Sequence, residues 1–180
     1  MNIKSIQPLE AYQNEIAALA EKELLFINKK LRVNSKDIEK KDIIKNLSIT
    51  GYNYLYRDGN DKRGTSFFLF MLRLGLLSCT KKAISIHLSK KIVLNSRIKK
   101  DKAVQINGLL KEIIRNEYKV NKNVTISEID AFANTTTHRH FLYKNDDNKK
   151  TISFKVLLRI CIAMDIYKRK NNIITIGRRK

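Results

Sequence analysis

Apolar residues recur at a spacing of three or four over most of the chain, which is typical of amphipathic helices. Pro8 suits a first helical turn, so the pattern that follows it predicts a long helix over 9–31. A second helix is expected over 38–47, with Ser35 and Glu39 as a weak N-terminal capping pair. Two more are expected, a short one at 51–56 capped by Ser48 or Thr50, and a strongly apolar one at 67–77 opened by Thr65 or Ser66.

After this helix, the spacing of the apolar residues changes to every second position. Alternating apolar residues at 84–88 and 92–94 predict two short strands, which could form a hairpin about Lys90 and Lys91. Helical spacing returns afterwards, with Asp101, Thr125, Asn134 and Ser153 as candidate caps of helices at 102–120, 126–133, 135–143 and 153–167. The segment 173–176, Ile-Ile-Thr-Ile, is a last strand candidate.

The two halves of the chain resemble each other. Leu55-Tyr56 matches Leu142-Tyr143, and Ser66-Phe67 matches Ser153-Phe154, in each case at an offset of 87 residues. Further on, the Ile-Ser-Ile of 84–86 resembles the Ile-Thr-Ile of 174–176. A duplicated module is the simplest explanation, and chance similarity between helical segments is the alternative.

The net charge of the chain indicates a polyanionic binding partner. The 180 residues include 37 Lys and Arg against 17 Asp and Glu, a net charge of +20. Residues 1–80 carry 13 basic and 9 acidic side chains, whereas residues 81–180 carry 24 and 8. This asymmetry favours a polyanion, with nucleic acid first and an anionic membrane surface second. An AT-rich coding sequence would enrich Lys, Ile and Asn but would not place the excess in one half.

Several classes of protein are excluded by what the chain lacks. Cys79 and Cys161 cannot form a disulfide scaffold, are expected in the core, and suit a reduced cytosolic protein. The most apolar run contains Arg73 and is too short to span a bilayer, and no secretory leader pattern is present. His138 and His140 are two residues apart and point to different helix faces, so no zinc site is expected. Without phosphate-loop or nucleophile motifs, we expect no enzyme, no metal and no cofactor.

Within 105–167, the helix at 108–118 (Gly-Leu-Leu-Lys-Glu-Ile-Ile-Arg-Asn-Glu-Tyr) is followed by the short helix at 126–133, the polar helix at 135–143 and the helix opened by Ser153. This order resembles the lambda-repressor/Cro-like (Xre-type) helix-turn-helix family, and 22–78 resembles it more weakly. The turn has Ala133-Asn134 where the family often has Gly, and His138 stands where an aliphatic residue is usual.

The resemblance implies a mainly α fold with two tandem helix-turn-helix modules and short strands between and after them. A first, divergent module would cover 1–80, a basic β linker 81–102, and a second module with a C-terminal strand 103–180.

The resemblance also implies a DNA-reading helix in the second module. Arg139 can bond guanine bidentately, while the Thr hydroxyls suit phosphates and their methyl groups suit thymine. The candidate contacts of this module are Asn134, Thr135, Thr136, Thr137, Arg139, His140, Lys144, Lys149 and Lys150. The alternative is an ordinary solvated helix start and loop. In the first module the candidates are Thr50, Asn53 and Arg57, although that copy could instead contact protein or RNA.

The expected function is therefore sequence-specific binding of double-stranded DNA by a cytoplasmic, nucleoid-associated transcriptional regulator of a bacterium or mobile element. The protein would be a monomer or a homodimer, with no membrane partner and with a protein partner as an option for the first module. Two alternatives remain open, a phage-type inhibitor of a nucleoprotein (anti-CRISPR-like) and a plasmid replication initiator.

Overall fold

The fold combines helices with one small antiparallel sheet. The computed structural model describes residues 9–53, 64–120 and 153–178. In chain order the elements are α1 (Leu9–Asn34), α2 (Lys40–Leu47), α3 (Ile49–Asn53), α4 (Gly64–Arg73), β1 (Leu77–Cys79), β2 (Ala83–His87), α5 (Lys100–Val120), α8 (Phe154–Ala163), β3 (Tyr167–Lys170) and β4 (Ile173–Gly177). The mainly α expectation thus holds only loosely, because the sheet organises the molecule.

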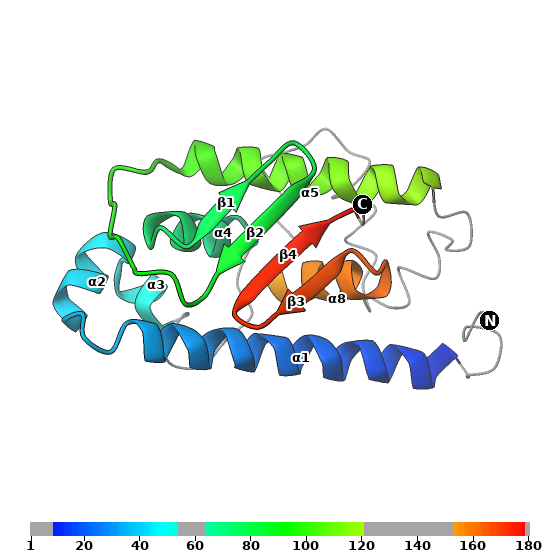
Figure 1. The fold of residues 1–180 in the computed structure, drawn as a ribbon, viewed down its shortest axis with the longest axis horizontal. Coiled ribbons are helices and arrows are strands. Elements are labelled where there is room, and N and C mark those ends of the chain that lie inside the picture. Colours follow the sequence, from blue (N-terminus) through cyan, green and yellow to red (C-terminus); the bar gives the residue numbers. More distant parts are fainter. Residues whose placement is uncertain (1–8, 54–63, 121–152, 179–180) are drawn as a thin grey trace.

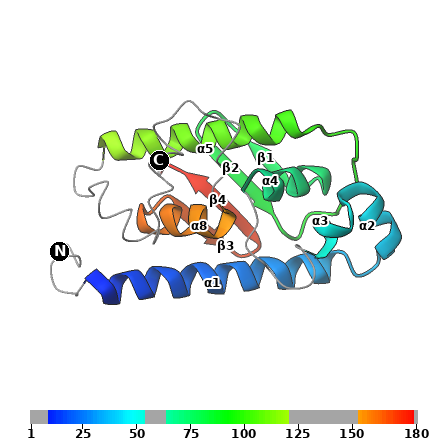
Figure 2. The ribbon, with the colours of Figure 1, turned by 180° about the vertical axis from the view of Figure 1, so that it is seen from behind.

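The four strands are antiparallel and lie in the order β1-β2-β4-β3. Because side chains alternate across a strand, one face of the sheet presents a row of isoleucines, Ile84, Ile86, Ile174 and Ile176, each at most 1% exposed. This inner face rests on α4 and α8, while α1 and α5 run along the two sides of the sheet (Figures 1 and 2). No described segment crosses the outer face (Figure 1).

The unit α4–β1–β2 recurs as α8–β3–β4, and equivalent residues of the two units differ by 90 in sequence number. Gly75 and Asp165 both adopt a positive φ, 71° and 58°, and each turns the chain from a helix into the following strand. The hydrogen bond from Leu76 N to Met71 O recurs as that from Ile166 N to Cys161 O. The offset of 87 residues predicted from Ser66-Phe67 and Ser153-Phe154 is therefore three too small for these helices, whereas the match of 84–86 with 174–176 already has the observed offset of 90.

Equivalent residues of the two hairpins meet at the centre of the sheet. Ser85 pairs with Thr175, and the flanking pairs are Ile84 with Ile176 and Ile86 with Ile174. Since Ser85 and Thr175 are themselves 90 residues apart, a pseudo-two-fold axis passes between them, perpendicular to the sheet. The strands predicted at 84–88 and 173–176 are confirmed as β2 and β4, which pair directly.

The first helix of each half packs on the other half. α1 lies against α8, and α5 lies against α4. The rings of Phe67 and Phe154 stack with centroids 3.6 Å apart where α4 meets α8. The expected boundary between residues 80 and 81 falls in the turn between β1 and β2, and the expected linker 81–102 supplies β2 and the first turn of α5.

Helix capping agrees with the sequence at two of the expected positions. Ser48 Oγ accepts from Gly51 N at the start of α3, and Ser153 Oγ accepts from Val156 N at the start of α8. Ser35 is not a cap, because its hydroxyl donates to Leu31 O at the end of α1, and the side chain of Glu39 makes no capping hydrogen bond at the start of α2. Asp101 lies within the first turn of α5 rather than before it.

Two further expectations are corrected. Residues 92–94 form no strand, because β1 is the hairpin partner of β2 and Val93 N instead donates to Leu74 O. Cys79 is exposed on β1 rather than buried in the core. Cys161 is fully buried in α8, and burial raises the pKa of its thiol to about 12.

Candidate nucleic-acid interface

Two of the predicted DNA contacts lie on α3. Thr50 is exposed and Asn53, one turn further on, is half-buried. Between them Gly51 is buried, and a Cβ at this position would lie 2.8 Å from Cζ of Phe70, so α3 sits directly on α4. The remaining predicted contacts, Arg57 in the first module and Asn134, Thr135, Thr136, Thr137, Arg139, His140, Lys144, Lys149 and Lys150 in the second, lie outside the described residues.

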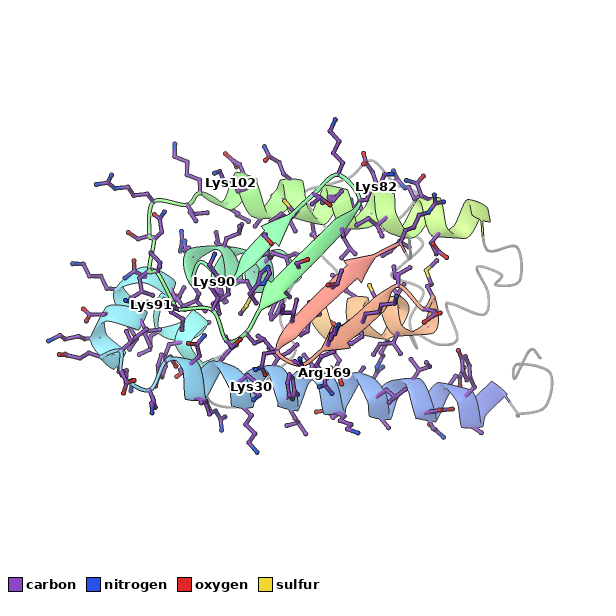
Figure 3. The ribbon with its side chains drawn as sticks, in the orientation of Figure 1. Lys30, Lys82, Lys90, Lys91, Lys102 and Arg169 are labelled. Atoms are coloured by element: carbon purple, nitrogen blue, oxygen red, sulfur yellow. The ribbon has the colours of Figure 1, made fainter. Side chains whose placement is uncertain are left out.

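A larger basic surface comes from residues 81–102, which we call the basic segment. It carries eight basic side chains and one acidic one, Asp101. All eight are exposed, and within the described ranges none forms an ion pair: Lys81, Lys82, Lys90, Lys91, Arg97, Lys99, Lys100 and Lys102. Lys82 stands at the β1–β2 turn, whereas Lys90, Lys91 and Lys102 lie toward the opposite end of the sheet and α5 (Figure 3). The segment therefore places exposed positive charge, with no ion-pair partner among the described residues, at both ends of β2 and at the start of α5.

Hydrogen bonds fix the backbone of this segment. The side-chain amide of Asn34 donates to Leu88 O and Lys90 O, at 2.9 and 2.8 Å. Arg73 Nε donates to Ile98 O, 3.1 Å away, and Asn95 N donates to Arg73 O. The lysines are thus attached to a backbone held by α1 and α4, so binding a ligand would order side chains rather than a loose segment.

Strand β3 divides its charges between the two faces of the sheet. Lys168 and Lys170 pair with Thr175 and Ile173 and share their outer face. Tyr167 and Arg169 alternate with them on the other face, where both donate to Glu23 of α1. The basic cluster that the sequence shows around 168–170 therefore contains two outward lysines and one arginine with a different role.

Arg169 is held by α1. Its Nε and Nη2 donate to the two carboxylate oxygens of Glu23, at 2.7 and 3.1 Å, and its guanidinium lies 4.1 Å from the centre of the Phe26 ring. Tyr167 donates to Glu23 as well, at 2.5 Å. Burial raises the pKa of Glu23, but the hydrogen bonds from Arg169 and Tyr167 outweigh burial and hold it below its usual value. The guanidinium of Arg169 therefore binds groups of the protein itself and is not a free cation for a ligand.

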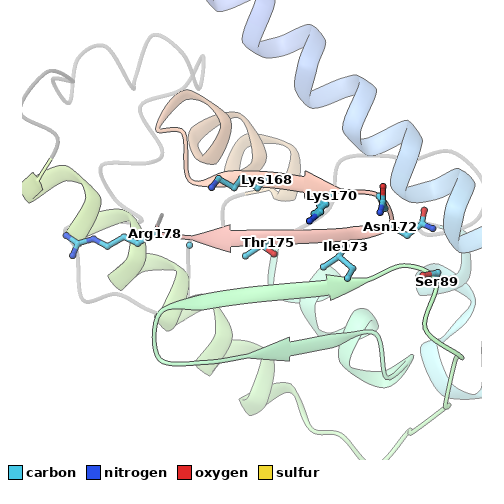
Figure 4. Close-up of a pocket in the computed structure, with 9 residues that line it drawn as sticks. Ser89, Lys168, Lys170, Asn172, Ile173, Thr175 and Arg178 are labelled. Carbon is cyan, nitrogen blue, oxygen red and sulfur yellow. The ribbon is translucent and has the colours of Figure 1, made fainter. Parts of the chain in front are cut away.

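An open groove of about 770 Å³ runs over the outer face of β3 and β4 (Figure 4). Its lining includes the basic residues Lys168, Lys170 and Arg178, together with Thr175 and Gly177. Arg178 is partly neutralised, because its Nε lies 3.8 Å from an oxygen of Glu117. At the far end the groove reaches Ser89, which directly precedes Lys90 and Lys91 of the basic segment.

Sequence reasoning identified the basic charge but not its arrangement. Lys168 and Lys170 were not among the predicted contacts, because the segment after Ile166 has no break that marks a new strand. The signal that could have found them is the alternation of Tyr167 and Arg169 with the two lysines, which is the pattern of a strand with two different faces.

Among the residues that the structure describes, no helix is long and apolar enough to cross a membrane. In the same ranges, no three His, Cys, Asp or Glu side chains gather as metal ligands would. No protein-family model, curated protein or solved structure matches the chain.

Proposed function

We propose that this protein binds double-stranded DNA as a transcriptional regulator, with a basic surface that contacts phosphates and two helix-turn-helix modules that select the sequence. The observation that carries the proposal is the basic segment, whose eight cations are exposed and unpaired within the described residues. Such a surface releases the counterions of a polyanion, which drives binding to nucleic acid. The modules rest on the sequence resemblance, and so do their candidate contacts in the second module, Asn134, Thr135, Thr136, Thr137, Arg139, His140, Lys144, Lys149 and Lys150.

The first test is the salt dependence of binding. If about six phosphates are neutralised, the slope of log K against log salt is about −5. Fluorescence anisotropy with a labelled duplex between 50 and 300 mM NaCl measures this slope. A slope shallower than about −2 would contradict binding through the basic surface.

The second test addresses sequence selection. A random-sequence selection should converge on one motif, and Arg139→Ala should then weaken binding to that motif by about 1–3 kcal/mol more than binding to scrambled DNA. Lys149→Ala should weaken both by similar factors and make the salt slope shallower by roughly one. If Arg139→Ala weakens both DNAs equally, Arg139 does not contact a base.

The two alternatives predict different outcomes of the same selection. A motif found at a plasmid origin of replication would support an initiator. No motif, together with tight binding to a protein–RNA complex, would support an inhibitor of a nucleoprotein.

A further inference from the structure

We propose that the outer face of the sheet is a second DNA-contacting surface, which holds the phosphate backbone of a duplex across the pseudo-two-fold axis. This inference rests on the proposed function and assigns it a site that the helix-turn-helix resemblance does not include. Three observations carry it: the residues on this face, the charge around it and its position on the axis.

Most residues of the outer face carry a hydroxyl group or a basic group, and Ile173 is a large apolar exception. Ser78, Ser85 and Thr175 are register partners in one row across three strands, and the row ends in Lys168 on the fourth. The next row contains His87, Ile173 and Lys170. Hydroxyl groups and lysines are common phosphate contacts, and small side chains let a backbone approach closely. These rows contain no carboxylate that would repel a phosphate.

The same rows favour a duplex over a single strand. Surfaces that bind unpaired bases use aromatic side chains as stacking platforms. The outward positions of the four described strands carry no Phe, Tyr or Trp, and His87 is engaged by Ser78 Oγ, 2.9 Å from its Nε2. The face can therefore contact sugar and phosphate but offers little to an exposed base.

Charge on this face is continuous with the basic segment. Lys168 and Lys170 are exposed and have no ion-pair partner within the described ranges. From them the groove leads to Ser89, and Leu88 N donates to Asn172 O, which joins the end of β2 to the β3–β4 turn (Figure 4). A polyanion lying in the groove would pass from the two β3 lysines to Lys90 and Lys91.

The position of the face matches the symmetry of the ligand. The pseudo-two-fold axis passes between Ser85 and Thr175, at the centre of the outer face. The sugar-phosphate backbone of a duplex also has two-fold axes perpendicular to its length, and two-fold proteins commonly align with them. A duplex centred here would have one half of the protein on each side of its own axis.

The test compares two double variants of the full chain that remove the same charge. Lys168→Gln with Lys170→Gln changes the outer face. Lys22→Gln with Lys29→Gln removes two exposed lysines from α1, on the same side of the helix as the exposed Leu25 and away from the core. Both variants should keep the wild-type melting temperature, because all four lysines are exposed. Replacement of Lys168 and Lys170 by Arg should keep wild-type binding.

At 0.15 M salt, the outer-face variant should bind a 30-base-pair duplex about 5- to 30-fold more weakly, with a slope shallower by about two. The α1 variant should lose about two-fold or less. Equal losses in the two variants would overturn this inference and leave the proposed function intact. A wild-type protein that fails to bind duplex would contradict the proposed function itself.

Two further outcomes would also overturn the inference. A loss on single-stranded DNA as large as the loss on duplex would show that the face does not distinguish a duplex. Binding to vesicles containing phosphatidylserine that depends on Lys168 and Lys170, without binding to duplex, would assign the face to a membrane surface.

Discussion

Glu23 connects the two halves of the protein through a single side chain. It lies on α1 and accepts from Tyr167 and Arg169 on β3, more than 140 residues away in sequence. The positions of β1 that are pseudo-equivalent to Tyr167 and Arg169 carry the uncharged residues Leu77 and Cys79, and Cys79 is exposed. The two halves are therefore not interchangeable, because the buried carboxylate of Glu23 needs the hydrogen-bond donors that only β3 carries at these positions.

We predict that Glu23→Gln lowers the free energy of unfolding by about 2 kcal/mol at pH 7, because it removes charged hydrogen bonds from a side chain that is 11% exposed. The folded-state pKa of Glu23 is lowered, so its contribution is complete above its unfolded value, near 4.5, and is lost as the pH falls through the folded pKa. The difference between the variant and wild type, measured by urea unfolding, should therefore shrink below pH 4.5.

Glu21 provides the control for Glu23. It pairs with Lys155 on α8, but its side chain is 51% exposed. Glu21→Gln should cost about 0.5 kcal/mol, since exposed ion pairs contribute little. Equal costs at the two positions would show that the Glu23 cluster adds nothing beyond a surface pair.

At the scale of elements, the sheet depends on β4, which lies between β2 and β3. Its inward and outward residues should differ sharply in their contribution. Ile174→Ala, at a position 1% exposed, should cost about 2–5 kcal/mol, whereas Ile173→Ala, at a position 43% exposed, should cost about 1 kcal/mol or less. Chemical denaturation of the two variants measures both values, and similar costs would mean that the two faces of β4 are equally buried.

The sequence predicted β2 and β4 but not β1 and β3, for a physical reason. Alternation in 84–86 and 174–176 shows a strand with one buried face, whereas 77–79 and 167–170 follow apolar helices with no break in the pattern. The helices end where Gly75 and Asp165 adopt a positive φ, and Asp165 in particular carries no sequence signal strong enough to predict this. The outward direction of Lys168 and Lys170 follows only once β3 is known.

The whole molecule is held together by contacts that cross between its halves. α1 packs on α8 and α5 on α4, and the sheet is completed only when both hairpins are present. Each half alone would expose the faces of two helices and one edge of a two-stranded hairpin, which is marginally stable by itself.

We therefore predict that a chain divided between Ser96 and Arg97, both exposed, gives two fragments that are unfolded alone and fold when mixed. Circular dichroism and melting of each fragment and of the equimolar mixture measure this. A cooperative melting transition in either fragment alone would show that a half is an independent domain, as the sequence-based boundaries between 1–80, 81–102 and 103–180 imply.

The pairing of Ser85 with Thr175 within one chain has a consequence for how the protein responds to dilution. A chain with a single helix–hairpin unit could complete this sheet only by binding a second chain. At low concentration, the amount of the complete sheet would then fall with the square of the chain concentration. Covalent linkage replaces that encounter with a fixed effective concentration. A surface built from both halves then exists in every folded molecule, and its occupancy follows the first power of the protein concentration even at a few copies per cell.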